Sequence, residues 1–147
     1  MTKRHKTKVG IVGAGPAGLL LSKLLANAGI ENIIVDRQGR DYIEGRIRAG
    51  VLEWGSVEAI REAGIGERMD REGLPHDGFD MCFDGELHRI DLKSLTDQKV
   101  MVYGQTEVTK DLFDAHAKRG TEVIFSVEDS EIVDAKSDHP ILSLIHI

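Results

Sequence analysis

Three glycines near the N-terminus carry the clearest chemical signal in this sequence. Gly13, Gly15 and Gly18 follow the apolar run Val9–Val12 with the spacing G-x-G-x-x-G. Gly13 allows the chain to turn sharply, Gly15 leaves room for a pyrophosphate because it has no Cβ, and Gly18 lets a helix lie close to the strand. Pro16 suits the first turn of that helix, whose unpaired N–H groups attract a diphosphate. The spacing predicts a dinucleotide site.

An acidic residue ends the next apolar run, at Asp36. A carboxylate at the carboxyl end of a second strand accepts hydrogen bonds from an adenosine ribose. An acid there disfavours a 2′-phosphate, so we do not expect NADP in this site. Strand, glycine turn, helix and acid occur together, which favours a dinucleotide site over a chance glycine turn, although the motif does not separate FAD from NAD.

Two arginines form a second candidate site. Arg46 and Arg48 lie between Gly45 and Gly50, two residues apart, so in an extended segment both side chains point to the same side. Arginine pairs of this kind bind phosphate, and glycines allow a ligand to approach the backbone closely. The local pattern alone leaves a phosphate contact and a solvated basic loop equally favoured.

The elements that must position these residues predict an α/β fold. We expect a Rossmann-like parallel sheet with flanking helices and a β-hairpin excursion, as an incomplete domain. The expected strands cover residues 9–12, 33–35, 100–103, 123–125 and 128–134, with a hairpin over 79–92 that turns at Asp84-Gly85. The expected helices cover residues 16–28, 51–63 and 65–69. A fourth helix ends before Gly120 and is capped by Thr106 or Thr109, and residues 73–76 are expected to be a connector.

Length, charge and cysteine content exclude several classes of protein. The chain has 147 residues, a net charge of −6 and one cysteine, Cys82. An acidic balance argues against a nucleic-acid surface, and one cysteine excludes an internal disulfide framework. We expect Cys82 to be a half-buried structural thiol, the histidines to bind no metal, and the protein to be cytoplasmic, with no membrane partner. Residues 1–8 are expected to be a flexible tail, 9–140 the N-terminal part of an FAD-binding domain, and 141–147 a truncated or artefactual tail.

Four segments together resemble one enzyme family. They are residues 12–21, residues 45–53, Arg61-Glu62-Ala63-Gly64 and residues 102–109. From about Lys8 to about Pro140 the chain resembles the N-terminal part of the 4-hydroxybenzoate 3-monooxygenases, which are class A FAD-dependent aromatic hydroxylases. The glycine motif is shared by many flavoproteins, whereas residues 45–53 and 103–109 are far more specific.

The resemblance implies an NADPH-driven hydroxylation of 4-hydroxybenzoate to 3,4-dihydroxybenzoate through a flavin C4a-hydroperoxide. Its partners would be a small aromatic substrate, O₂ and, at full length, a second copy of the chain. It implies FAD contacts at the glycine turn including Pro16 and Ala17, at Asp36, and at residues Arg46, Ile47, Arg48, Ala49, Gly50, Val51 and Gln105. It links the NADPH preference to Arg37, Gln38 and Tyr42, with NADPH bound elsewhere than FAD. It implies no catalytic residue in these 147 positions, since the substrate-binding residues of the family lie later in its sequences.

Other functions remain open from the sequence. The chain could be a non-catalytic, partial dinucleotide-binding module, since the family's later motifs are missing from it. It could belong to another FAD-dependent phenol hydroxylase. An NAD-dependent dehydrogenase uses the same strand-helix-strand unit, but nothing after Asp36 supports that class.

Overall fold

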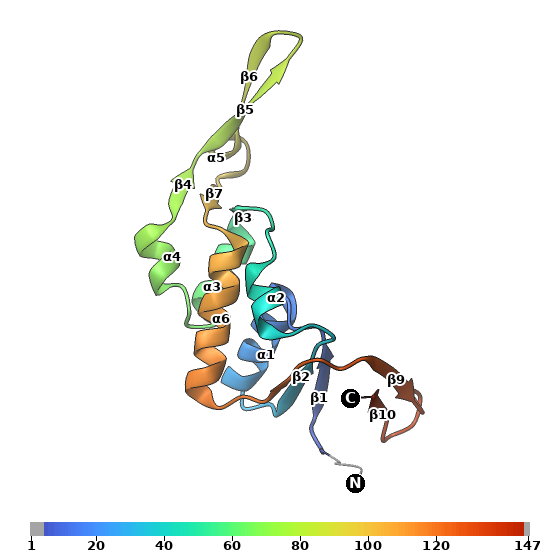
Figure 1. Cartoon of the computed structure of the whole chain (residues 1–147). Helices are drawn as coiled ribbons and strands as arrows, with labels where there is room; N and C mark the ends of the chain where they lie inside the picture. Colours follow the sequence, from blue (N-terminus) through green and yellow to red (C-terminus); the bar gives the residue numbers. More distant parts are fainter. Residues whose placement is uncertain (1–4, 146–147) are drawn as a thin grey trace. The chain divides into compact units, whose positions relative to one another are not determined.

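The computed structural model describes residues 5–145, which form two compact units (Figure 1). One unit contains the described residues up to Arg46 and from Leu112 onward, and the other runs from Ile47 to Asp111. The predicted flexible tail and the predicted C-terminal tail lie partly outside the described residues, at positions 1–4 and 146–147.

The first unit is built on a strand-helix-strand motif. Strand β1 (Val9–Val12) leads into helix α1 (Pro16–Asn27), and the chain returns in β2 (Asn32–Val35). The two strands are parallel, with Val12 opposite Val35. Strand β8 (Val123–Ile124) is parallel to β2 on its other side, which gives the order β1-β2-β8. The predicted parallel sheet is therefore confirmed in this unit.

Helix α1 is fixed against the sheet by both apolar and polar contacts. The core of the unit comes from α1, the sheet, helix α2 (Arg40–Gly45) and the end of helix α6 (Gln105–Arg119). Its buried apolar residues include Ile11, Leu19, Ile34, Val35, Ile43, Leu112 and Phe113. Ser22 is fully buried and donates to Asn32 Oδ1, and Arg119 donates to the Ala26 carbonyl near the end of α1. These contacts tie the middle of α1 to β2 and the end of α1 to α6.

Helix α6 begins earlier than its threonines suggest. It starts at Gln105, so neither Thr106 nor Thr109 caps it, and the predicted caps are wrong. The Thr109 hydroxyl instead donates to the Gln105 carbonyl at 2.7 Å, a bond that satisfies a hydroxyl inside a helix. The helix ends at Arg119, and Gly120 has a φ of +74°, as expected for a glycine stop.

A two-stranded antiparallel sheet follows β8. Strand β9 (Asp129–Val133) confirms the strand expected over residues 128–134. It pairs with β10 (Ile141–Ile145), so Ile141 lies opposite Val133. The described part of the expected C-terminal tail is therefore a strand, while residues 5–8 precede β1 without helix or strand.

The second unit contains an antiparallel sheet that the sequence did not predict. Strands β3 (Val51–Glu53), β7 (Val100–Val102) and β4 (Leu74–His76) pair in the order β3-β7-β4. The prediction of a helix from residue 51 is wrong for its first turn, because residues 51–53 pair with β7 and helix α3 (Trp54–Glu62) starts after them. The predicted connector at 73–76 is also wrong, because it pairs with the other edge of β7. Helix α4 (Glu67–Glu72) begins later than the helical turn expected at 65–69.

The predicted hairpin is confirmed. Strands β5 (Gly78–Phe83) and β6 (Glu86–Asp91) are antiparallel, and helix α5 (Leu92–Thr96) follows them. Asp84 and Gly85 have φ values of 50° and 82°, the two positive angles of a type I′ turn. Cys82 lies exposed on this hairpin, so the prediction of a half-buried thiol is wrong.

Candidate functional site

The glycine turn after β1 has the geometry that the motif predicts. Gly13 has a φ of +114°, which favours glycine, and its N–H donates to the Val35 carbonyl at 2.8 Å. A Cβ on Gly18 would lie 1.9 Å from the Gly13 carbonyl oxygen. The turn and α1 therefore approach each other so closely that the third glycine cannot carry a side chain.

The N-terminus of α1 has the features of a diphosphate site. Gly15 precedes the helix in an extended conformation, no side chain caps the helix, and its first turn holds no acid. A Cβ built on Gly15 has no atom of the described protein within 4 Å, so the space above this residue is open. The Ala17 and Gly18 N–H groups belong to the first turn, where amides lack acceptors inside the helix. A diphosphate fits this arrangement, because the helix dipole and these amides both favour an anion.

Asp36 joins the glycine turn to the end of β2. Its Oδ2 accepts a hydrogen bond from the Ala14 N–H at 2.6 Å, and its Oδ1 accepts one from the Gln38 N–H at 2.7 Å. Each carboxylate oxygen has two lone pairs, so both can still accept from ribose hydroxyls. Asp36 thus has a structural role that sequence reasoning missed.

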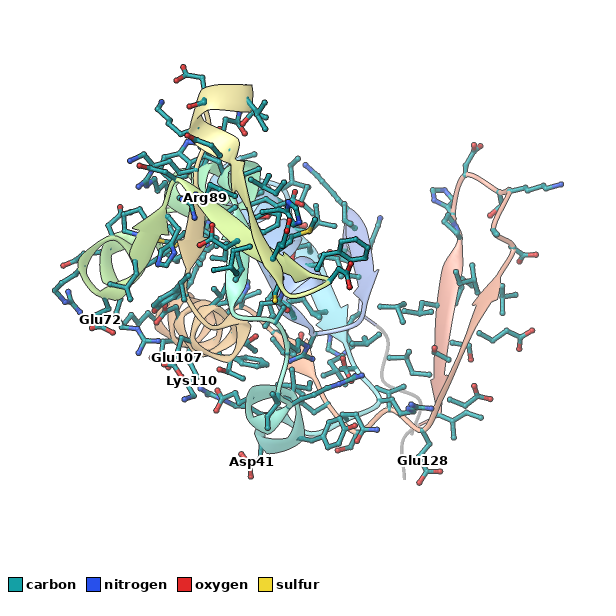
Figure 2. The ribbon with its side chains drawn as sticks, turned by 90° about the horizontal axis from the view of Figure 1, so that it is seen from above. Asp41, Glu72, Arg89, Glu107, Lys110 and Glu128 are labelled. Atoms are coloured by element: carbon teal, nitrogen blue, oxygen red, sulfur yellow. The ribbon has the colours of Figure 1, made fainter. Side chains whose placement is uncertain are left out.

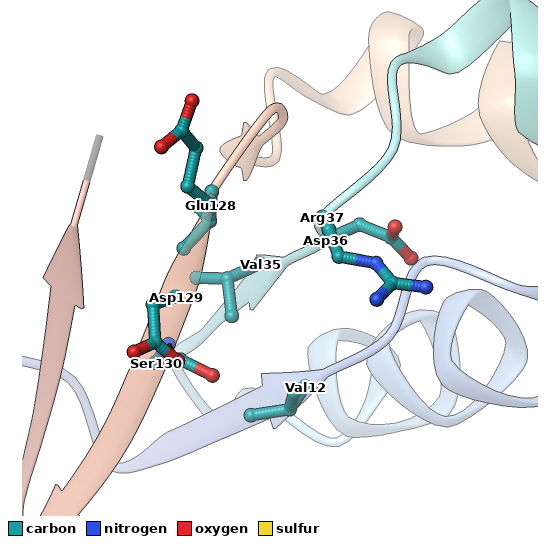
Figure 3. A pocket seen from close by; sticks show the side chains of 8 residues that line it. Val12, Val35, Asp36, Arg37, Glu128, Asp129 and Ser130 are labelled. Atoms are coloured by element: carbon teal, nitrogen blue, oxygen red, sulfur yellow. Dashed lines mark hydrogen bonds between the residues drawn. The ribbon is translucent and has the colours of Figure 1, made fainter. Parts of the chain in front are cut away.

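A pocket of about 190 Å³ opens beside Asp36 (Figure 3). Val12 and Val35 line it from the ends of β1 and β2, together with Arg37. The rest of its lining comes from residues 127–130, which the sequence did not identify. Two backbone bonds bring this segment to the site: the Val127 N–H donates to the Asp36 carbonyl at 3.1 Å, and the Asp36 N–H donates to the Ile124 carbonyl at 2.9 Å. No motif marks residues 127–130, because a backbone hydrogen bond between positions distant in the sequence places them here.

The remaining predicted residues of the first unit lie after Asp36. Arg37 lines the pocket, the Gln38 amide is bonded to Asp36, and Tyr42 is exposed on α2. Arg46 follows α2 in an extended conformation, in agreement with the extended segment expected around the two arginines.

The second unit holds the other predicted FAD residues. The Gln105 N–H donates to the Ala49 carbonyl at 3.1 Å, and the Tyr103 N–H donates to the Gly50 carbonyl at 2.8 Å. Val51 lies opposite Val102 in the sheet. Residues 49–51 and Gln105, which are more than fifty positions apart in the sequence, therefore lie side by side. Ile47 is strongly exposed, and Arg48 lies in the irregular segment before β3.

A buried histidine supports the helix that carries the glycine turn. His116 on α6 is 2% exposed, and its Nε2 lies 2.9 Å from the Leu19 carbonyl of α1. A carbonyl can only accept, so Nε2 carries the proton, while the buried Nδ1 has no hydrogen-bond partner in the described protein. Burial lowers the pKa of His116, and the positive charges of Lys23 and Arg119 lower it further, against the opposite effect of the Leu19 bond. The ring is therefore neutral in the folded protein near pH 7.

This histidine should make the stability of the chain depend on pH. Because its folded-state pKa lies below the ordinary value of 6.5, its stabilising effect is complete above pH 6.5 and is lost as the pH falls through the folded value. In His116→Gln, the amide can still donate to Leu19 but cannot titrate. We expect denaturant unfolding to show a shallower loss of stability between pH 7.5 and 5 in His116→Gln than in the original chain. His88→Gln, on the exposed hairpin, should retain the original slope, and equal slopes in all three proteins would contradict the prediction.

Residues 5–145 contain neither a candidate metal site nor a candidate membrane-spanning helix. The described His, Cys, Asp and Glu side chains form no group of three that could hold a metal ion. Over the same residues, no helix is long and apolar enough to cross a membrane.

Comparison with known proteins agrees with this geometry. Residues 6–141 match the family described as "FAD binding domain". The chain is 48% identical over 130 residues to the p-hydroxybenzoate hydroxylase of Acinetobacter baylyi, which covers 88% of the chain and 32% of that protein. It is 33% identical over 72 residues to the phenol 2-monooxygenase of a Pseudomonas species, covering 49% of the chain and 12% of that protein. The chain thus spans about a third of the length of the first of these relatives and less of the second.

Solved structures share the fold at lower sequence identity. PqsL from Pseudomonas aeruginosa superposes with a TM-score of 0.74 at 20% identity, over 92% of this chain and 38% of that chain. The p-nitrophenol 4-monooxygenase PnpA from Pseudomonas putida superposes with a TM-score of 0.71 at 21% identity, over 86% of this chain and 34% of that chain. At these identities the likeness concerns the fold alone.

Proposed function

This chain belongs to the FAD binding domain family, and from that membership we propose that it is the nucleotide-binding part of an FAD-dependent aromatic monooxygenase. The complete protein would hydroxylate 4-hydroxybenzoate to 3,4-dihydroxybenzoate with NADPH and O₂. The substrate is proposed from the 48% identity to p-hydroxybenzoate hydroxylase. The phenol 2-monooxygenase match supports the alternative of a different phenolic substrate.

The single observation that carries the proposal is the uncapped start of α1 with open space above Gly15. The FAD diphosphate would accept hydrogen bonds from the Ala17 and Gly18 N–H groups, with Gly13 shaping the turn. Asp36 would accept from the ribose, and the adenine side of the cofactor would enter the pocket beside Val12 and Val35.

The flavin end of the same molecule is assigned to residues further along the chain. Arg46 and Arg48 would pair with phosphate, and Ala49, Gly50 and Val51 would offer backbone groups to the flavin ring beside Gln105. The bonds from Tyr103 and Gln105 to residues 49 and 50 support the grouping of this second set.

The chemistry of oxygen activation would come from bound FAD, as in flavoenzymes generally. The residues of this chain would bind the cofactor and fix its orientation. NADPH would reduce it from a different site, with the preference for this nucleotide depending on Arg37, Gln38 and Tyr42. Arg37, which lines the pocket beside Asp36, and Tyr42 on α2 are both exposed, which suits contact with a second nucleotide.

We further propose that the isolated 147-residue chain binds the cofactor without hydroxylating the substrate. It spans about a third of the relative that it matches, and none of its residues is assigned to the aromatic substrate. Hydroxylation by the purified chain at the rate of a complete enzyme would refute this part of the proposal.

The decisive experiment compares FAD binding to the original chain and to Gly15→Ala. Gly15 has an ordinary φ of −72° and open space around a Cβ, so the substitution should change the free energy of unfolding by less than about 1 kcal/mol. The added methyl would occupy the approach of the diphosphate, so we expect the Kd for FAD to rise on the order of 100-fold. Flavin absorbance and fluorescence titration measure the affinity.

Gly55→Ala is the matched control, because a Cβ there also meets open space but lies in α3. It should leave the FAD affinity unchanged. A chain that binds no FAD, or a Gly15→Ala protein that binds it as well as the original, would contradict the proposed site.

A further inference from the structure

Four side chains of the second unit form a connected cluster of charges and hydrogen bonds, called here the Arg68 cluster. Arg68 on α4 donates through Nη2 to Glu107 Oε2 at 2.6 Å, and its Nε lies 2.8 Å from Asp111 Oδ1. The Tyr103 hydroxyl donates to Asp111 Oδ2 at 2.7 Å. The guanidinium carbon of Arg68 also lies 5.6 Å from the centre of the Tyr103 ring. One arginine thus contacts Tyr103, which precedes α6, and two carboxylates within that helix.

The cluster is partly removed from solvent. Tyr103 is 6% exposed, and about a third of the Arg68 side chain is exposed. Burial, together with the hydrogen bond to Asp111, raises the pKa of Tyr103, so its hydroxyl remains a donor. Partial burial alone would lower the pKa of Arg68, but the Glu107 bond and the Asp111 charge raise it overall, so the guanidinium stays charged.

Tyr103 connects this cluster to the residues assigned to the flavin. Its own N–H donates to the Gly50 carbonyl, and two residues later the Gln105 N–H donates to the Ala49 carbonyl. Between them lies Gly104, whose carbonyl accepts from the first turn of α6. The turn from β7 to α6 is therefore bonded to residues 49 and 50 on both sides of Gly104.

We propose that the Arg68 cluster is a positioning device that holds residues 103–105 against residues 49–50 and so fixes the orientation of the flavin. This inference rests on the proposed function and adds Arg68, Tyr103 and Asp111 to it as positioning residues. Arg68 and Asp111 act through Tyr103, which they hold by its hydroxyl and its ring. Glu107 orients Arg68 and is itself paired with Lys110, which lies near it on α6 (Figure 2).

Hydrogen exchange tests the positioning without any cofactor. The full chain would be compared with Arg68→Gln and Tyr103→Phe, and the exchange of the Tyr103 and Gln105 amides followed by NMR or mass spectrometry. Each variant removes a bond to a charged partner, so we expect both amides to exchange on the order of tenfold faster. Amides in the α1 region should be unaffected.

Arg61→Gln is the matched control. Arg61 also binds a carboxylate of α4, Asp70, at 2.7 Å and lies 5.1 Å from the Trp54 ring, so it resembles Arg68 in charge, exposure and contacts. Its substitution should leave the exchange of the Tyr103 and Gln105 amides unchanged. Equal acceleration in Arg61→Gln and Arg68→Gln would show a general loss of stability and would overturn the proposal.

A second measurement follows the flavin itself. With FAD at saturation, Arg68→Gln and Tyr103→Phe should change the visible absorbance shape and the fluorescence yield of the bound flavin, whereas Arg61→Gln should not. Variants with faster amide exchange but an unchanged flavin spectrum would overturn the functional part of the inference. If the original chain binds no FAD, the proposed function fails for this chain and the cluster keeps only a structural role, which the exchange experiment still measures.

Discussion

Gly18→Ala is expected to unfold or severely destabilise the first unit and to abolish FAD binding. The added Cβ would lie 1.9 Å from the Gly13 carbonyl oxygen, 3.1 Å from its carbon and 3.3 Å from Ile11 Cγ2. These are backbone atoms and a strand side chain, so α1 must move away from β1. Overpacking of this kind costs about 3 kcal/mol or more, which is a large part of the stability of a small domain. Denaturant unfolding measures the loss, and a flavin titration measures the binding.

The control for this substitution lies in the adjoining strand. Gly10 is in β1, and a Cβ on it meets no atom of the described residues within 4 Å. Gly10→Ala should therefore be neutral or slightly stabilising, because alanine has fewer unfolded conformations than glycine. If Gly18→Ala were as stable as Gly10→Ala, the close approach of α1 to the glycine turn would be wrong.

Asp36→Ala is expected to weaken FAD binding on the order of 100-fold and to lower the free energy of unfolding by about 2 kcal/mol. The stability loss comes from the Ala14 and Gln38 amides, which lose a charged acceptor. The affinity loss has two sources, a loosened glycine turn and missing bonds to the ribose. Calorimetric titration with FAD and denaturant unfolding measure the two effects.

Two ligands separate the sources of the affinity loss. ADP and 2′,3′-dideoxy-ADP share the diphosphate and adenine but differ in the ribose hydroxyls. If Asp36 binds the ribose, Asp36→Ala should weaken the binding of ADP more than the binding of the dideoxy compound. Equal weakening would show that Asp36 acts only through the glycine turn. Asp41→Ala, which removes the same charge from the first turn of α2, should leave the binding of both ligands unchanged.

The glycine turn and the Arg68 cluster predict different kinds of defect. Substitutions at Gly15 and Asp36 act where the diphosphate and ribose would lie, so they change affinity. Substitutions at Arg68 act through Tyr103 on the flavin end, so they change the spectrum of flavin that is still bound. The two sets of residues can therefore be tested separately.

Local sequence determined the strand-helix-strand motif, the glycine turn and the hairpin. These elements depend on neighbours within about thirty positions: the positive φ of Gly13 and the Asp84-Gly85 turn follow from residue type, and α1 from apolar spacing. The candidate residues of the dinucleotide site were therefore found without a structure. The resemblance of residues 45–53 and 102–109 to a flavoprotein family added a second set of candidate cofactor residues, at positions 46–51 and 105.

Only the tertiary structure decided features that depend on distant partners. Residues 51–53 have apolar spacing that suits a helix, but pairing with residues 100–102 makes them a strand. Residues 127–130 join the pocket because the Val127 N–H donates to the Asp36 carbonyl, a backbone bond for which no side-chain pattern exists. The bonds of Asp36 to two loop amides and the contact of Arg68 with Asp111 are likewise absent from any local motif. Sequence specifies what a residue can bind, whereas the pairing of remote strands and helices decides which partner it meets.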